Sequence, residues 1–102
     1  MDLLILSEAK DDIQSIHDWY ESKRPGLGFD FELCLESTFD RISLFPESHP
    51  KKILPTRLAI LQHFPYGVYY REHDNSIVVL AVFNFKQNPK MIKKIISNRI
   101  RK

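Results

Sequence analysis

Two stretches in the first half of the chain carry apolar residues at helical spacing. One stripe consists of Ala9, Ile13, Ile16 and Tyr20. The other consists of Phe31, Leu35, Phe39 and Ile42, flanked by Cys34 and Phe45. Spacings of three and four residues are typical of amphipathic helices that pack one face on a core. The Pro-Gly-Leu-Gly segment at 25–28 separates the stripes, so we predict two antiparallel helices joined by a short loop.

Capping and breaking residues mark the ends of these helices. Ser7 precedes several carboxylates, which favour the positive end of a helix dipole, and we predict Ser7 as the N-cap of the first helix. Pro46 and Pro50 should end the second helix, because proline interrupts the hydrogen-bond ladder. Residues 2–7 are too short and too apolar for a surface helix and predict an opening strand.

Shorter apolar runs follow in the second half of the chain. Residues 57–61, 64–71 and 77–86 predict three strands, and the His-Asp-Asn-Ser sequence at 73–76 suits a tight turn. The predicted order is β-α-α-β-β-β. We therefore predict an α+β fold in which a four-stranded sheet packs against the antiparallel helix pair.

Residues 90–102 combine apolar and basic side chains and predict a short basic C-terminal helix. Its apolar stripe comprises Met91, Ile92, Ile95, Ile96 and Ile100. Such a stripe needs a cover, which is either the chain's own sheet or a partner protein. In the second case Met91, Ile92, Ile95 and Ile96 would belong to a binding surface.

Length and composition fit one folded domain over residues 1–102, since 43% of the residues are hydrophobic. The longest apolar run, Ile77 to Phe83, is far shorter than the roughly 20 residues that span a bilayer. The N-terminus lacks the basic segment of a secretory signal. We therefore expect a cytoplasmic protein with no membrane partner.

Charge is distributed unevenly along the sequence. Residues 1–50 hold 4 Lys and Arg against 11 Asp and Glu, whereas residues 51–102 hold 11 against 2, so the net charges are −7 and +9. A block of positive charge is typical of a surface that meets nucleic acid or an acidic protein segment. A basic tail that only aids solubility is the alternative, but Lys51, Lys52, Arg57 and Arg71 precede the tail.

Motifs for common catalytic sites are absent from the sequence. It has no P-loop, no GxGxxG, no GxSxG and no His pair at metal-ligand spacing, so we expect no cofactor and no metal. Cys34 is the single cysteine and is expected to pack as a small apolar residue. We interpret the carboxylates of Asp11 and Asp12 as part of a solvated helix face.

Cationic and aromatic residues on adjacent predicted strands form the remaining candidate site. These residues are Arg57, Tyr69, Tyr70, Arg71, Asn84 and Lys86. Because strand side chains alternate between faces, Asn84 and Lys86 should point one way and Phe83 and Phe85 the other. Such a set can hold RNA phosphates while a ring stacks on a base. Alternatively, Tyr69 and Tyr70 only pack the sheet and Arg71 is solvated.

The order of several short motifs resembles the ParE-like branch of the RelE/ParE superfamily of bacterial type II toxins. The resemblance covers residues 3–89. Its markers are Ala9 and Asp12, the loop at 25–28 with Phe31 after it, Pro46, Arg57, the Phe64-Pro65-Tyr66 corner, and Ala81-Val82-Phe83 running into an Asn-Pro pair. The resemblance implies the same β-α-α-β-β-β fold and a cognate antitoxin, with which the toxin forms a hetero-oligomer.

Members of this superfamily differ in their cellular target. RelE-like toxins cut messenger RNA on the ribosome without a metal, using basic residues and a tyrosine, whereas ParE-like toxins poison DNA gyrase. In the nuclease pattern the last strand often ends in His-x-Arg/Lys-Arg, and this chain has Asn84 and Gln87 at the first and last positions. An amide cannot exchange a proton as a general acid or base, and neutral Gln contacts phosphate weakly.

Three hypotheses follow from this resemblance. The favoured one is a gyrase-binding toxin that contacts its target or antitoxin through Arg57, Asn84, Lys86 and the C-terminal stripe. The second is a ribosome-dependent endoribonuclease whose candidate catalytic residues are Arg57, Tyr70, Arg71 and Lys86. The third is an inactive, toxin-like binding module.

Overall fold

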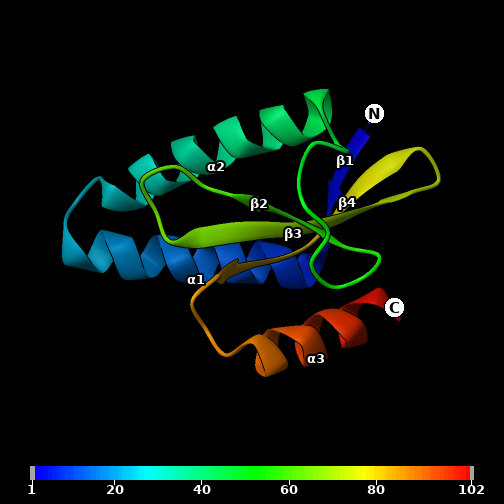
Figure 1. Cartoon of the computed structure of the whole chain (residues 1–102). Coiled ribbons are helices and arrows are strands. Elements are labelled where there is room, and N and C mark those ends of the chain that lie inside the picture. The colour runs from blue at the N-terminus through cyan, green and yellow to red at the C-terminus, as the bar shows by residue number, and fades with distance from the viewer. Residues whose placement is uncertain (1, 102) are drawn as a thin grey trace.

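A computed structural model describes residues 2–101 as a four-stranded sheet with helices on both faces (Figure 1). In chain order the elements are β1 (Asp2–Ile5), α1 (Ser7–Lys23), α2 (Leu27–Leu44), β2 (Arg57–Ile60), β3 (Tyr66–His73), β4 (Ser76–Asn84) and α3 (Pro89–Ile100). The strands lie in the order β1-β4-β3-β2, with β1 parallel to β4 and the other pairs antiparallel. The predicted α+β fold is confirmed.

A two-residue turn joins β3 to β4, as the His-Asp-Asn-Ser sequence predicted. His73 pairs with Ser76, and the two residues between them, Asp74 and Asn75, have φ values of 50° and 60°. Positive φ at both central residues is the geometry of a type I′ turn, which matches the twist of the flanking strands. Aspartate and asparagine tolerate this geometry better than most residues.

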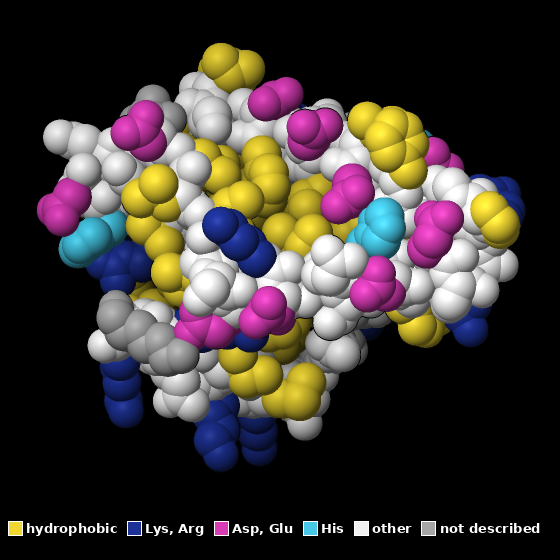
Figure 2. Space-filling view, turned by 180° about the vertical axis from the view of Figure 1, so that it is seen from behind, with side chains coloured by type: hydrophobic (Ala, Val, Ile, Leu, Met, Phe, Trp, Pro, Cys, Tyr) yellow, Lys and Arg dark blue, Asp and Glu magenta, His cyan; other side chains and the backbone are white. Residues whose placement is uncertain are grey.

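The two faces of the sheet bury different residues. Val68, Tyr70, Ile77 and Val79 point toward α1 and α2 and meet the predicted helical stripes. The opposite face packs against α3. It comprises Leu58, Tyr69, Leu80 and Ala81. The sheet is therefore the middle of three layers, and dark-blue basic side chains project where α3 lies at the lower edge of the molecule (Figure 2).

Close packing at the start of α2 fixes the angle between the two helices. The carboxylate of Glu21 accepts hydrogen bonds from the backbone amides of Gly26 and Gly28, at 2.9 and 3.0 Å. These two bonds lower the pKa of Glu21, because they stabilise the carboxylate. A Cβ at Gly28 would lie only 2.8 Å from the backbone oxygen of His17, so α1 and α2 can approach this closely only with glycine there.

The predicted N-cap at Ser7 is wrong. Ser7 is the first residue of α1, Leu6 occupies the N-cap position, and the Ser7 hydroxyl donates to Glu8 at 3.2 Å. The reason is the one-residue connection between β1 and α1. The Leu6 amide still donates to Val79 of the sheet, so the chain enters the helix directly from the strand.

The C-terminal helix covers its own sheet. Ile92 and Ile96 are buried there, while Met91 is 44% exposed on the outer side of α3. Of the two predicted covers for this apolar stripe, the chain's own sheet is therefore the one that the structure shows. No helix within residues 2–101 is long and apolar enough to cross a membrane.

Candidate functional site

Two of the predicted catalytic residues hold a loop in place. Arg57 donates hydrogen bonds to the backbone oxygens of Glu47 and His49, at 3.1 and 2.8 Å. The hydroxyl of Tyr70 donates to the Pro46 oxygen at 2.6 Å, and its side chain is fully buried. Arg57 and Tyr70 are opposite one another on β2 and β3. Both side chains therefore anchor the segment between α2 and β2.

Burial changes the proton affinity of two side chains at this loop, Tyr70 and His49. Burial raises the pKa of Tyr70 to about 12, although the nearby Arg57 opposes the rise. Burial also lowers the pKa of His49, with further lowering from the positive charges of Arg41 and Arg57. Tyr70 thus stays protonated at neutral pH.

Replacing Tyr70 with phenylalanine tests its structural role. The change removes one part-buried hydrogen bond, to the Pro46 oxygen, and we expect the free energy of unfolding to fall by about 1 kcal/mol. Stabilisation from a raised tyrosine pKa is fully present below the unfolded value near pH 10 and is lost as pH rises through about 12. Denaturant titrations from neutral pH upward should therefore show a smaller alkaline loss in Tyr70→Phe than in the wild type.

Tyr69→Phe is the matched control for stability at neutral pH, since the Tyr69 hydroxyl makes no hydrogen bond within residues 2–101. Burial raises the pKa of Tyr69 as well, so this variant should also show a smaller alkaline loss than the wild type. Both variants should keep any growth-arresting activity. Loss of activity in a folded Tyr70→Phe protein alone would contradict a purely structural role.

The other predicted catalytic residues lie elsewhere. Arg71 follows Tyr70 and so points to the α3 face, where it lies 3.0 Å from His73. Lys86 is exposed in the turn after β4, and its amide donates to Asn84 Oδ1 at 2.9 Å. Our prediction that Lys86 belongs to the strand is wrong, because β4 ends at Asn84. Arg57, Tyr70, Arg71 and Lys86 are therefore not gathered into one site.

An apolar groove with a basic rim lies between β2 and α3. It has a volume of about 470 Å³ and is floored by Ile53, Leu58, Ile60, Tyr69, Phe85 and Ile92. Lys52 and Lys93 stand on its two walls, and none of its described lining residues is acidic. This groove combines one residue of the predicted binding stripe, Ile92, with residues of the sheet that the sequence did not single out.

The groove also reaches the open edge of the sheet. The Leu58 amide donates to Pro50 at 3.0 Å, outside the pairing with β3, while the Leu61 amide donates to Tyr66 of β3. Because backbone groups alternate along a strand, the amide of Ile60 faces outward like that of Leu58. The Ile60 side chain is 49% exposed beside it. The Ile60 oxygen on this edge accepts from Arg41 at 3.5 Å, so the groove offers a partner apolar surface and one main-chain donor, the Ile60 amide.

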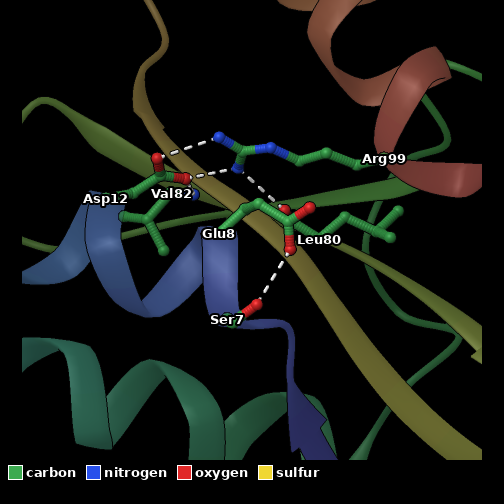
Figure 3. Close-up of polar contacts among 6 residues, drawn as sticks. All are labelled: Ser7, Glu8, Asp12, Leu80, Val82 and Arg99. Carbon is green, nitrogen blue, oxygen red and sulfur yellow. Dashed lines mark hydrogen bonds and ion pairs between the residues drawn. The ribbon is translucent and has the colours of Figure 1, made fainter. Parts of the chain in front are cut away.

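Sequence reasoning missed a polar cluster that fastens α3 to the rest of the fold (Figure 3). Asp12 of α1 and Arg99 of α3 form a two-bond ion pair, at 2.6 and 3.1 Å, with both side chains nearly buried. Asp12 also accepts from the Val82 amide at 3.1 Å, and Arg99 donates to the Leu80 oxygen at 2.9 Å. The pair therefore supplies hydrogen-bond partners for the backbone groups of β4 that lie beyond the end of β1.

Our interpretation of Asp12 as a solvated carboxylate is therefore wrong. A signal was present in the sequence: Asp12 lies three residues after Ala9 and four before Ile16, on the buried side of α1. Arg99 likewise follows Ile92 and Ile96 at helical spacing. A charge within an apolar stripe indicates a buried partner, although the spacing alone does not identify that partner.

Comparison with known proteins identifies the family. Residues 3–89 match the family model described as the ParE toxin of the type II toxin-antitoxin system parDE. The chain belongs to the ParE toxin family. The family match ends at residue 89, where α3 begins, so the helical wall of the groove lies outside the matched region. The chain is thus a toxin of the type II toxin-antitoxin class.

Solved structures agree with this assignment at the level of the fold. The chain resembles one from the chromosomal ParDE toxin-antitoxin system of P. aeruginosa, with a TM-score of 0.74 and 17% sequence identity. The similarity covers 82% of this chain and 95% of that chain. A search of curated proteins finds no match. The predicted ParE-like fold is therefore confirmed by structure as well as by sequence.

Proposed function

We propose that this ParE-family toxin arrests growth in the cytoplasm by binding DNA gyrase, and that a cognate antitoxin neutralises it in a hetero-oligomeric complex. The observation that carries the proposal is the contrast between two surfaces. The predicted nuclease residues are dispersed, and two of them are engaged with backbone carbonyls. The groove between β2 and α3, by contrast, is open and suited to binding a protein segment.

The chemistry of the groove defines the antitoxin segment that it fits. Lys52 and Lys93 on the rim favour carboxylates, and the apolar floor favours aliphatic or aromatic anchors. An acidic amphipathic segment provides both. An extended segment could also pair with the outward-facing amide of Ile60. The toxin-antitoxin system of the similar P. aeruginosa structure supports the expectation of such a partner.

Messenger RNA cleavage is less well supported. The side-chain oxygen of Asn84 accepts a hydrogen bond from the Lys86 amide and so closes the turn after β4. Because the Asn84 side chain is an amide, it has no proton to exchange near neutral pH. Tyr70 is buried away from solvent. Lys86 is an exposed cation, but Arg71 lies apart from it on the α3 face beside His73, so the remaining cations are not gathered around one phosphate position.

Expression of the chain alone and together with the adjacent reading frame tests the proposal. The chain alone should arrest growth, and co-expression should restore growth and yield a co-purified complex. Mapping of RNA ends after induction should show no new cleavage within ribosomal A sites. Cleavage there would instead support the nuclease hypothesis, and neither arrest nor complex formation would support an inactive binding module.

A further inference from the structure

A second groove lies on the outer side of the helix pair, away from the groove between β2 and α3. It has a volume of about 370 Å³, and its apolar lining includes Ile5, Ile13, Leu35 and Phe39. Figure 2 shows a hollow with a yellow, hydrophobic floor on the face turned away from the viewer in Figure 1. We refer to this feature as the α1–α2 groove.

Two large apolar side chains stand exposed at the border of the α1–α2 groove. Phe29 is 60% exposed and Leu33 is 49% exposed, and both line the groove. They lie four residues apart on α2, so they share one face of the helix. Apolar side chains that border a groove add to one continuous patch, and such patches mark binding sites for other molecules.

Two carboxylates line this apolar surface, which belongs to the acidic part of the chain. Helices α1 and α2 together contain nine Asp and Glu residues against three Lys and Arg residues. Glu32 and Glu36 line the groove, and Glu36 makes no hydrogen bond or ion pair within residues 2–101. Glu32 lies 3.3 Å from His17. Several magenta side chains border the hollow in Figure 2, although one dark-blue side chain also reaches it.

These features define the chemistry of an occupant. Glu32 and Glu36 are one helical turn apart on α2, as are Phe29 and Leu33. Carboxylates and apolar side chains therefore both recur once per helical turn along the groove. A helix with Lys or Arg beside a stripe of aliphatic residues has the same period and the opposite charge. We propose that the α1–α2 groove binds a basic amphipathic helix contributed by another protein.

A second copy of this chain fits the groove less well. Among residues 2–101 the strongly basic helix is α3, which already buries Ile92 and Ile96 on its own sheet and leaves Met91 as its exposed large apolar residue. In addition, α3 and the helix pair lie on opposite faces of the sheet. Copies joined through these surfaces would therefore add head to tail in an open chain.

Binding of a synthetic helical peptide tests this proposal without knowledge of the natural partner. The probe is a peptide of Leu and Lys at amphipathic helical spacing, and its counterpart has Glu in place of every Lys. Titration of the ¹⁵N-labelled chain should shift the backbone amide signals of residues 29–36 with the Leu/Lys peptide only. Glu32→Lys/Glu36→Lys should weaken this binding at least about tenfold.

A matched control separates the groove from general charge. Glu47→Lys/Glu72→Lys makes the same change in net charge at exposed positions outside the groove and should leave the affinity within about twofold of the wild type. Leu33→Ser should weaken binding without changing charge. The dispersion of the amide signals shows that each variant is folded.

Several outcomes would overturn the proposal. One is equal weakening by the two charge-reversal variants, and another is signal shifts confined to β2 and α3. Self-association of the wild type that Glu32→Lys/Glu36→Lys abolishes would assign the groove to a second copy instead. The proposal is independent of gyrase binding and of the antitoxin, so loss of toxicity is not among its readouts.

Discussion

Replacing Asp12 with alanine should lower the free energy of unfolding by about 3 kcal/mol, because it leaves the Arg99 guanidinium without its carboxylate in a nearly buried site. The variant also deprives the Val82 amide of its acceptor at the edge of β4. Chemical denaturation followed by far-UV circular dichroism measures the change. Because Arg99 lies in the last turns of α3, we also expect faster amide hydrogen exchange in that helix.

The neighbouring Asp11 is the matched control, since it is exposed and makes no hydrogen bond or ion pair among the described residues. Asp11→Ala should change stability by no more than about 0.5 kcal/mol. In the double variant Asp12→Ala/Arg99→Ala the losses should be less than additive, since the two residues form one interaction. Equal stability of Asp12→Ala and Asp11→Ala would contradict the role assigned to the ion pair.

Reversing the two rim charges of the β2–α3 groove should weaken antitoxin binding by about a hundredfold. Lys52→Glu/Lys93→Glu places two negative charges where the proposed acidic segment binds, and each close like-charge contact replaces an attraction. A hundredfold change corresponds to about 2.7 kcal/mol. The measurement is calorimetric titration of the purified chain with the protein encoded by the adjacent reading frame.

A second pair of lysines provides the control for this experiment. Lys51 and Lys94 adjoin Lys52 and Lys93 in sequence, are exposed and do not line the groove. Lys51→Glu/Lys94→Glu has the same net charge as the rim variant, but its effect on affinity should be several times smaller. If the two double variants bind equally well, the antitoxin segment does not occupy this groove.

The fold could be predicted from sequence because its determinants are local or periodic. The stripes on α1 and α2 alternate with polar residues at helical spacing, and the Asp74-Asn75 turn requires positive φ at both residues. The cap at Ser7 could not be placed reliably, because the position of a helix start depends on how the preceding strand pairs. Here the pairing of Leu6 with Val79 determines it.

The candidate site was harder to predict, because its residue types are compatible with more than one environment. Tyr70 and Arg57 have the chemistry of a nuclease, but their partners are carbonyls of a loop distant in sequence. The β2–α3 groove depends on how α3 crosses the sheet, which the apolar stripe of α3 alone does not specify. The sequence thus predicted a binding surface in the basic half but did not locate a groove there.

The most direct test of the proposed function is the action of the purified chain on DNA gyrase. The chain should be added to gyrase with ATP and relaxed plasmid, and the products should be separated after protease and detergent treatment. We predict that linear plasmid accumulates as the concentration of the chain increases, and that the antitoxin prevents this accumulation. Normal supercoiling without linear plasmid at a molar excess of the chain would contradict gyrase poisoning.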